Sequence, residues 1–174
     1  QIFVKSTMDS YYLGFDLSTQ QLKCLAVNQD LKIVHSETIV FEKDLPKYQT
    51  TKGVYIKGDV IACPVAMWIE SIDLIFEKFL QSGFELNKVK AISGSCQQHG
   101  SVYWADCAES MLNKLDASNG SLLDQLVPGA FSRPTAPNWQ DHSTGKQCQA
   151  FESKVGGPQG LAKITGSRAH FRFT

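Results

Sequence analysis

The chain has 174 residues, of which 43% are hydrophobic and 20% charged, and this is enough for one domain with a sizeable core. Seventeen basic residues balance seventeen acidic ones, so there is no overall field to attract nucleic acid or an anionic membrane. No apolar run reaches the length of a bilayer span or of a secretory leader, and we expect neither nucleic acid nor a membrane as a partner.

The five cysteines are scattered along the chain and show no Cys-x-x-Cys spacing. A zinc site or a disulfide framework would leave a clearer pattern. Reduced thiols in a cytoplasmic protein are the simpler interpretation. Cys24, Cys63 and Cys96 have apolar neighbours in the sequence, and we expect them to be small core residues.

Both ends of the sequence favour a portion of a longer protein. The chain begins with Gln1 rather than Met and stops at Thr174 without a terminating signal. We expect a flexible tail over residues 1–10 and an incomplete N-terminal domain over residues 11–174.

The first elements are three strand-like runs, over residues 11–16, 22–28 and 32–41, with a turn at residues 29–30. The loose alternation in the third run is typical of a strand that is partly covered on both faces. These runs predict a three-stranded meander.

The turn between the first two runs carries an unusual set of polar residues. They are Asp16, Ser18, Thr19, Gln20 and Lys23, with Gly14 just before them. Hydroxyl, amide and main-chain donors are what phosphate oxygens require. Asp16 could hold Mg²⁺ through water, since Mg²⁺ is usually bound by one or two carboxylates together with phosphate oxygens. The alternative is an ordinary hairpin with a polar turn.

The next stretch changes period. Residues 43–63 contain Pro, Gly and isolated aromatic residues, which indicates a long loop or an extra hairpin on the surface. From Pro64 to Leu80 apolar residues recur at helical spacing, and Ser82-Gly83 ends this predicted helix. We interpret Trp68 as a core residue of the helix.

Residues 89–96 are small or β-branched and predict a strand that ends in Gln97-Gln98-His99-Gly100, after which residues 101–104 resume as a strand. Ligands collect where strands of open α/β sheets end. His99 is therefore either a satisfied turn histidine or a donor to a polyhydroxy substrate.

The last third predicts short helices and one rigid link. The helices are expected over residues 105–115, 121–127, 144–154 and 159–164, and the extended link over residues 133–137. Trp139 and Asp141 follow the link; they suit a sugar site, or else a buried Trp and the N-cap of the next helix. Arg168 and Arg172 would share a face if they lay on a helix, and they could otherwise be solvated or salt-bridged.

Four segments together resemble the FGGY carbohydrate kinase family, most closely its fungal xylulokinase branch. They are Gly-x-Asp-x-Ser-Thr-x-x-x-Lys at 14–23, Gln-Gln-His-Gly-Ser at 97–101, Trp-Gln-Asp at 139–141, and Thr-Gly-Ser-Arg-Ala-His-Phe-Arg-Phe-Thr at 165–174. The resemblance runs from about residue 11 to the last residue. It implies a ribonuclease H-like α/β fold, as in actin, sugar kinases and the Hsp70 ATPase, with a mixed sheet and helices on both faces.

The resemblance also implies the reaction and its residues. ATP would phosphorylate D-xylulose at its 5-hydroxyl, with Mg²⁺ as the metal. The nucleotide phosphates would be bound by Ser18, Thr19, Gln20 and Lys23, with Asp16 acting through Mg²⁺. The sugar would be bound by Gln98, His99 and Arg172, with Trp139 and Asp141 lining or supporting its pocket.

The family's catalytic base is an Asp in a Gly-Asp-Asn segment, and the 174 residues contain no such segment. Sugar kinases close two lobes around the substrate, and closure assembles the catalytic groups. We expect this chain alone to lack turnover and to need the missing C-terminal lobe of the same enzyme as its partner.

Three alternatives stay open. Another FGGY kinase, for ribulose, gluconate or glycerol, would keep the phosphate motif. A ribonuclease H-like nuclease would need several clustered carboxylates, and Asp16 has no obvious partner in the sequence. A non-catalytic half-domain would only bind a sugar or a partner protein, with its exposed half-interface favouring association.

Overall fold

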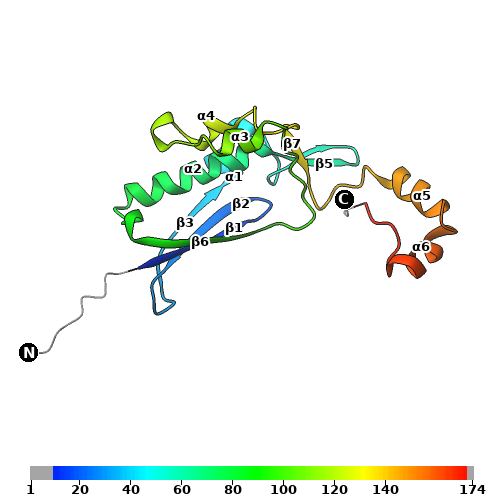
Figure 1. Ribbon diagram of the computed structural model, residues 1–174, viewed down its shortest axis with the longest axis horizontal. Coiled ribbons are helices and arrows are strands. Elements are labelled where there is room, and N and C mark those ends of the chain that lie inside the picture. The colour runs from blue at the N-terminus through cyan, green and yellow to red at the C-terminus, as the bar shows by residue number, and fades with distance from the viewer. Residues whose placement is uncertain (1–9, 172–174) are drawn as a thin grey trace, which may run out of the picture.

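The computed structural model describes residues 10–171 and is built around a four-stranded sheet (Figure 1). The strands, in spatial order, are β3 (Ile33–Val40), β2 (Gln21–Val27), β1 (Tyr11–Leu17) and β6 (Val89–Cys96). β1, β2 and β3 are antiparallel neighbours, whereas β6 runs parallel to β1. The predicted meander and mixed sheet are confirmed. The expected tail lies outside the described residues except for Ser10.

One face of this sheet forms the core because side chains alternate along each strand. Leu13 of β1 lies opposite Ala26 of β2, and Leu22 of β2 lies opposite Ile39 of β3. All four side chains are buried. Register is therefore fixed, since a shift by one residue would expose the whole set.

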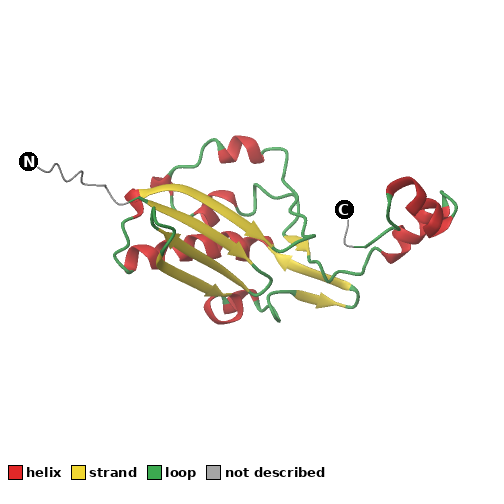
Figure 2. Ribbon diagram, turned by 90° about the horizontal axis from the view of Figure 1, so that it is seen from below, coloured by secondary structure: helices red, strands yellow, loops and turns green. Residues whose placement is uncertain are grey.

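Helix α2 (Val65–Gln81) covers this buried face, and Pro64 precedes its first turn (Figure 2). Its inward residues recur every three or four positions, and Trp68 lies among them as predicted. The buried positions are Val65, Met67, Trp68, Ser71, Ile75 and Phe79. Full burial of a side chain such as Phe79 stabilises the fold by about 1.5–3 kcal/mol.

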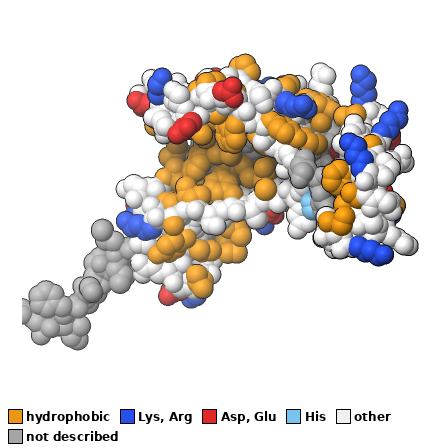
Figure 3. Space-filling view, turned by 45° about the vertical axis from the view of Figure 1, so that its right-hand side comes forward, with side chains coloured by type: hydrophobic (Ala, Val, Ile, Leu, Met, Phe, Trp, Pro, Cys, Tyr) orange, Lys and Arg blue, Asp and Glu red, His pale blue; other side chains and the backbone are white. Residues whose placement is uncertain are grey.

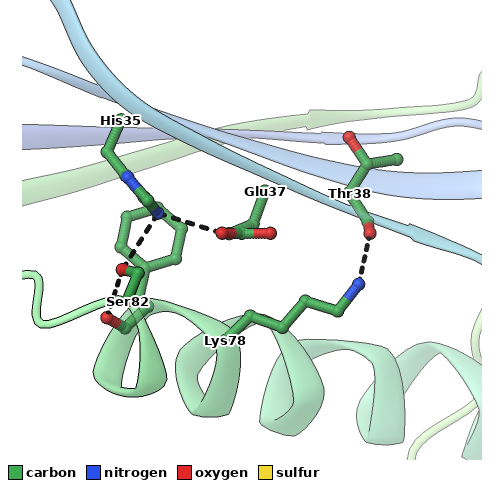
Figure 4. A network of polar contacts seen from close by, with 6 residues as sticks. His35, Glu37, Thr38, Lys78 and Ser82 are labelled. Atoms are coloured by element: carbon green, nitrogen blue, oxygen red, sulfur yellow. Dashed lines mark hydrogen bonds and ion pairs between the residues drawn. The ribbon is translucent and has the colours of Figure 1, made fainter.

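Polar contacts hold the C-terminal end of α2 to β3 (Figure 4). His35 Nε2 lies 3.0 Å from Glu37 Oε1 and 3.2 Å from Ser82 Oγ, while Lys78 Nζ donates to the Thr38 carbonyl at 2.9 Å. The His35 ring also packs against the core aromatic residues Phe79 and Phe84. These contacts fix where the helix ends over the sheet.

The opposite face of the sheet is open in the described part of the chain. Tyr12, Gly14 and Asp16 alternate with the core positions of β1 and are exposed. The helical cover expected on both faces is thus present on one face here. Cys96 is also exposed, so its expected core position is wrong, because β6 lies at the sheet edge beyond the reach of α2.

A second, three-stranded sheet continues from the first. Its strands are β4 (Tyr55–Lys57), β5 (Val60–Pro64) and β7 (Thr135–Pro137), and the chain reaches them through α1 (Phe41–Asp44) and the short helix η1 (Pro46–Tyr48). The extra hairpin considered for residues 43–63 is confirmed as β4 and β5. The predicted extended link pairs with β5 through β7.

Several short helices follow in the chain. They are α3 (Ala108–Leu112), η3 (Ala117–Asn119) and α4 (Leu122–Leu126), while η2 (Leu86–Lys88) leads into β6. Helix α4 packs on α2, and α3 packs on α4. Asp73 of α2 caps α4, accepting hydrogen bonds of 2.9 Å from the amides of Leu122 and Leu123. The strand predicted for residues 101–104 is wrong, because this segment forms no ladder with a neighbouring strand and has one isolated bridge, between Trp104 and Phe131.

Helices α5 (Gly145–Ser153) and α6 (Gly157–Thr165) pack on each other at the end opposite the N-terminus (Figure 1). Arg168 follows α6 in a non-helical segment, so the proposed helical face fails for it, and Arg172 lies outside the described residues. No helix in the described part of the chain has the length and apolar content needed to cross a bilayer.

Candidate active site

The turn between β1 and β2 carries the residues predicted to bind phosphate, and we call it the phosphate turn; Asp16 lies at its entrance. The Ser18 amide donates to the Gln21 carbonyl at 3.0 Å and closes the turn. The Ser18 hydroxyl lies 3.2 Å from both carboxylate oxygens of Asp16. Asp16 is exposed and lies in register with Lys23 of β2 and Ser95 of β6. A carboxylate, a lysine and hydroxyls thus share one open face.

A loop from the hairpin region forms a second wall beside this turn. Gly53 lies so close that a Cβ atom there would be 1.9 Å from the Thr19 carbonyl oxygen. A cavity of about 550 Å³ lies between the two segments, and Thr19, Gln20, Lys52 and Trp139 are among its lining residues. The loop therefore brings a second lysine to the phosphate turn.

The residues predicted to bind sugar gather at the end of β6. Gln98, His99 and Trp139 line a cavity of about 280 Å³ together with Gln97. The His99 backbone is in the left-handed region, with φ of 59°, which turns the chain sharply after the strand. An exposed amide from Gln98, the half-buried amide of Gln97, an imidazole and an indole thus line one small cavity.

Asp141 does not line this small cavity, although it is among the residues that line a larger one. It is buried, and its Oδ1 accepts the Ile61 amide of β5 at 2.9 Å. Its Oδ2 accepts the amide and the hydroxyl of Ser143 at 3.3 and 2.6 Å. Both oxygens are thus engaged within the protein, so of the two predicted pocket roles the geometry favours the supporting one. Asp141 does not cap α5, which follows Thr144 without a side-chain cap.

A larger cavity of about 770 Å³ extends from His99 toward α5. Arg133 and Tyr103 are among its lining residues, and the Arg133 guanidinium lies over the Tyr103 ring at 5.1 Å from its centroid. His99 lines both this cavity and the smaller one. His99 therefore stands at the junction of these two cavities.

Hydrogen bonds join the phosphate turn to the sugar side. Trp139 Nε1 donates to Thr19 Oγ1 at 3.1 Å, and Thr19 Oγ1 donates to Gln97 Oε1 at 3.3 Å. Asn138 Nδ2 donates to the same Gln97 oxygen at 2.7 Å. Beneath this ring lies Cys63, whose burial raises the pKa of its thiol despite amide contacts from Asn138 and Gln97. Residues 19, 97 and 139 thus form one connected site.

Curated relatives of known type match almost the whole chain. Xylulose kinase of Saccharomyces cerevisiae is 67% identical over 169 residues, covering 97% of this chain and 28% of that protein. The chain is a homologue of xylulose kinases over this part of their length. Probable D-xylulose kinase A of Aspergillus fumigatus is 48% identical over 166 residues, covering 94% of this chain and 28% of that protein. The chain thus spans a little over a quarter of these relatives' length. No model of a protein family matches the chain.

Solved structures show that this homologue has the sugar kinase fold. Xylulose kinase from Bifidobacterium adolescentis has a TM-score of 0.57 and 18% identity, covering 93% of this chain and 27% of that one. Glycerol kinase from Plasmodium falciparum has a TM-score of 0.60 and 14% identity, covering 95% of this chain and 27% of that one. Gluconate kinase from Lactobacillus acidophilus has a TM-score of 0.58 and 15% identity, covering 89% of this chain and 24% of that one. The ribonuclease H-like fold expected from the sequence is confirmed.

Sequence reasoning missed four residues that shape the site. Gln97 and Asn138 directly precede predicted residues, and burial of an amide in a motif is the signal that would have found them. Lys52 and Gly53 belong to residues 43–63, for which the sequence predicts only a loop or a surface hairpin. Only the fold brings this segment beside the phosphate turn.

Proposed function

We propose that this chain forms the nucleotide-phosphate and sugar-binding part of a D-xylulokinase, which uses ATP to convert D-xylulose into D-xylulose 5-phosphate in pentose catabolism. The observation that carries the proposal is the 67% identity with a xylulose kinase over 97% of the chain. The ring that joins Thr19 to Trp139 supports it, because phosphoryl transfer depends mainly on holding donor and acceptor together.

The phosphate turn and Asp16 would receive Mg·ATP, which supplies the phosphoryl group and a cation that neutralises its charge. Asp16 suits such a metal because its carboxylate is exposed and both of its oxygens accept from the small Ser18 hydroxyl at 3.2 Å. In the described part of the chain, no three His, Cys, Asp or Glu side chains lie together so that they could hold a metal ion. Asp16 would therefore be the single protein carboxylate that holds the magnesium ion. Gln20, Lys23 and the backbone of the turn would hold the phosphates.

The sugar would lie against Trp139, with Gln98 and His99 donating to its hydroxyls. Arg172 completes this proposed set from outside the described residues. Asp141 would hold the Trp139 segment against β5 without touching the sugar. An aromatic face beside amide and imidazole donors matches a small polyhydroxy ligand.

We place the catalytic base outside these 174 residues, because they contain no Gly-Asp-Asn segment. The chain would therefore bind ligands weakly and turn over only with the C-terminal lobe of the same enzyme. We also propose a cytoplasmic location without nucleic-acid or membrane partners, on the basis of the neutral charge and the five free cysteines.

The test uses the intact enzyme that contains this chain, with ADP release measured by a coupled assay. We expect the highest kcat/KM with D-xylulose, and Asp16→Asn should lower kcat about 100-fold or more. The matched control is Asp30→Asn, an exposed acid in the turn between β2 and β3, which should leave kcat unchanged. Equal loss in both variants would contradict the role of Asp16.

The same assay separates the alternatives. Gluconate and glycerol kinases match the fold about as well as xylulose kinases do, so the fold does not select the sugar. A higher kcat/KM with ribulose, gluconate or glycerol would assign another acceptor. Sugar binding without ADP release in the intact protein would favour a non-catalytic half-domain.

A further inference from the structure

Three distant segments meet in a ring of side-chain hydrogen bonds. Thr19 comes from the phosphate turn, Gln97 from the end of β6, and Asn138 and Trp139 from the segment after β7. Asn138 and Trp139 are neighbours in the chain, so the polypeptide itself closes the ring. Every hydrogen bond in it spans at least 41 residues of sequence. The ring is therefore tertiary structure, and no local turn explains it.

The Thr19 hydroxyl is fully committed as a donor. A hydroxyl has one hydrogen, and here that hydrogen goes to Gln97 Oε1 while Trp139 Nε1 occupies an acceptor site. A phosphate oxygen accepts but does not donate, so it can bind this hydroxyl only by taking the hydrogen from Gln97. The bond to be given up is 3.3 Å long, beyond the usual 2.5–3.0 Å of O–H···O bonds. The exchange is therefore inexpensive.

Gln97 and Asn138 are held firmly on the other side. Their mutual bond is 2.7 Å, the shortest in the ring. The backbone N–H of Gln97 donates to the Leu17 carbonyl at 2.8 Å, and the backbone N–H of Asn138 donates to the Ile61 carbonyl at 2.9 Å. Asn138 is also buried. Gln97 and Asn138 thus form a rigid pair. Gln98 follows the first of them in the chain and Trp139 follows the second, so a change in the bonding of Thr19 acts on a pair that is fixed beside both residues.

We propose that Gln97 is a positioning residue whose side-chain carbonyl couples the phosphate turn to the sugar pocket. With no phosphate bound, Gln97 shares the Thr19 hydrogen and the indole of Trp139 is fixed through Thr19. With phosphate bound, Thr19 turns its hydrogen away, and the indole and the Gln97 carbonyl settle into a second arrangement. The inference rests on the proposed function for the identity of the two ligands, but the ring itself does not depend on it.

The first test needs no ligand and uses the ¹⁵N-labelled 174-residue chain. Gln97→Met keeps the length of the side chain and removes its carbonyl. We expect the Trp139 indole resonance to move and those of Trp68 and Trp104 to stay, although no hydrogen bond joins Gln97 directly to Trp139. Gln97→Glu keeps the acceptor and should restore the resonance. Cys63→Ala, which removes the thiol below the ring, should leave it in place.

A second variant keeps this test decisive if Gln97→Met fails to fold. Thr19→Val removes the hydroxyl from the other end of the same bond, and we expect the side-chain amide resonances of Gln97 to move, whereas Thr19→Ser should preserve them. An unmoved Trp139 indole in Gln97→Met, or an unmoved Gln97 amide in Thr19→Val, overturns the positioning role.

The second test measures coupling in the intact enzyme. Calorimetry gives the Kd of a non-hydrolysable ATP analogue with and without D-xylulose, and linkage requires the reciprocal ratio to be equal. We expect a ratio of at least about fivefold in the wild type, within the usual range of coupling between sites. Gln97→Met should bring this ratio close to one, whereas Gln97→Glu should preserve it. A merely structural role would weaken both ligands and leave the ratio unchanged, which would overturn the coupling.

The outcomes separate this inference from the proposed function. A wild-type enzyme that binds neither D-xylulose nor the analogue contradicts the proposed function, while the indole and amide resonances still decide whether Gln97 positions Trp139. Normal ligand binding with an unchanged ratio in Gln97→Met contradicts the coupling alone.

Discussion

Replacing Gly53 with Ala should displace the phosphate turn and destabilise the fold. Gly53 has φ of +79°, a region that costs an L-residue about 1–2 kcal/mol. Its added Cβ would also lie 1.9 Å from the Thr19 carbonyl oxygen and 2.9 Å from the Thr19 carbonyl carbon. Both are backbone atoms, so no side chain can rotate away, and one segment must move.

The size of the effect follows from these two causes. Forcing extra volume into a packed position typically costs about 1–3 kcal/mol, and with the backbone penalty the loss is about 2–5 kcal/mol. Gly58→Ala is the matched control, because Gly58 has φ of +59° in the same hairpin region and its added Cβ would meet nothing within 4 Å. The control should therefore lose only about 1–2 kcal/mol.

Urea unfolding followed by circular dichroism measures both variants, provided that the slope m is the same in each. The difference between them isolates the contact with the turn. Equal losses in Gly53→Ala and Gly58→Ala would refute the conclusion that Gly53 is needed for close approach, and would leave only its backbone conformation to explain the loss.

Two further predictions concern thiols and pH. Burial raises the pKa of the Cys24 thiol to about 12 and also raises the pKa of the Cys63 thiol. Both thiols should therefore resist a thiol reagent until urea unfolds the chain, while the exposed Cys96 and Cys107 react at once. Early labelling of Cys24 would contradict its burial. Burial and a 2.6 Å hydrogen bond to the Glu70 carboxylate of α2 raise the pKa of Tyr48 in the folded protein. The stability that this tyrosine contributes is therefore complete below its unfolded pKa of about 10, and it is lost as the pH rises toward the higher folded pKa. Tyr48→Phe should therefore lose less stability than the wild type between pH 9 and about 11, and identical pH profiles in urea titrations would contradict this.

The elements that the sequence predicts well are those with a local signal, either a periodic pattern of apolar residues or a run of strand-forming residues with a clear end. The run from Val65 to Gln81 repeats at helical spacing, and residues 89–96 end at a polar block, so both appear in the structure where expected. Residues 101–104 have the composition of a strand but find only one bridging partner. Strand formation depends on a neighbour, and composition carries no information about the neighbour.

The site shows the same division. The chemistry of the turn at Thr19 is readable because its donors are adjacent in the sequence. Its contact with Trp139 spans 120 residues and depends on the path of the chain through β7. Asp141 looks like a ligand-binding acid in the sequence, but the fold surrounds its carboxylate with protein donors. Exposure of Cys96 likewise depends on strand order, which places β6 at an edge.

That edge has a practical consequence for handling the molecule. Seven of the eight residues of β6 are exposed, Lys90 is its one charged residue, and among the described strands only β1 pairs with it. Large apolar side chains such as Ile92, at 59% exposure, and Trp104, at 52%, also stay accessible, and Figure 3 shows hydrophobic side chains lining a hollow on one face. Such an edge is a template for pairing with other chains. Concentrated samples will therefore associate through β6 first, and a lysine at position 92 is the simplest way to keep the chain monomeric.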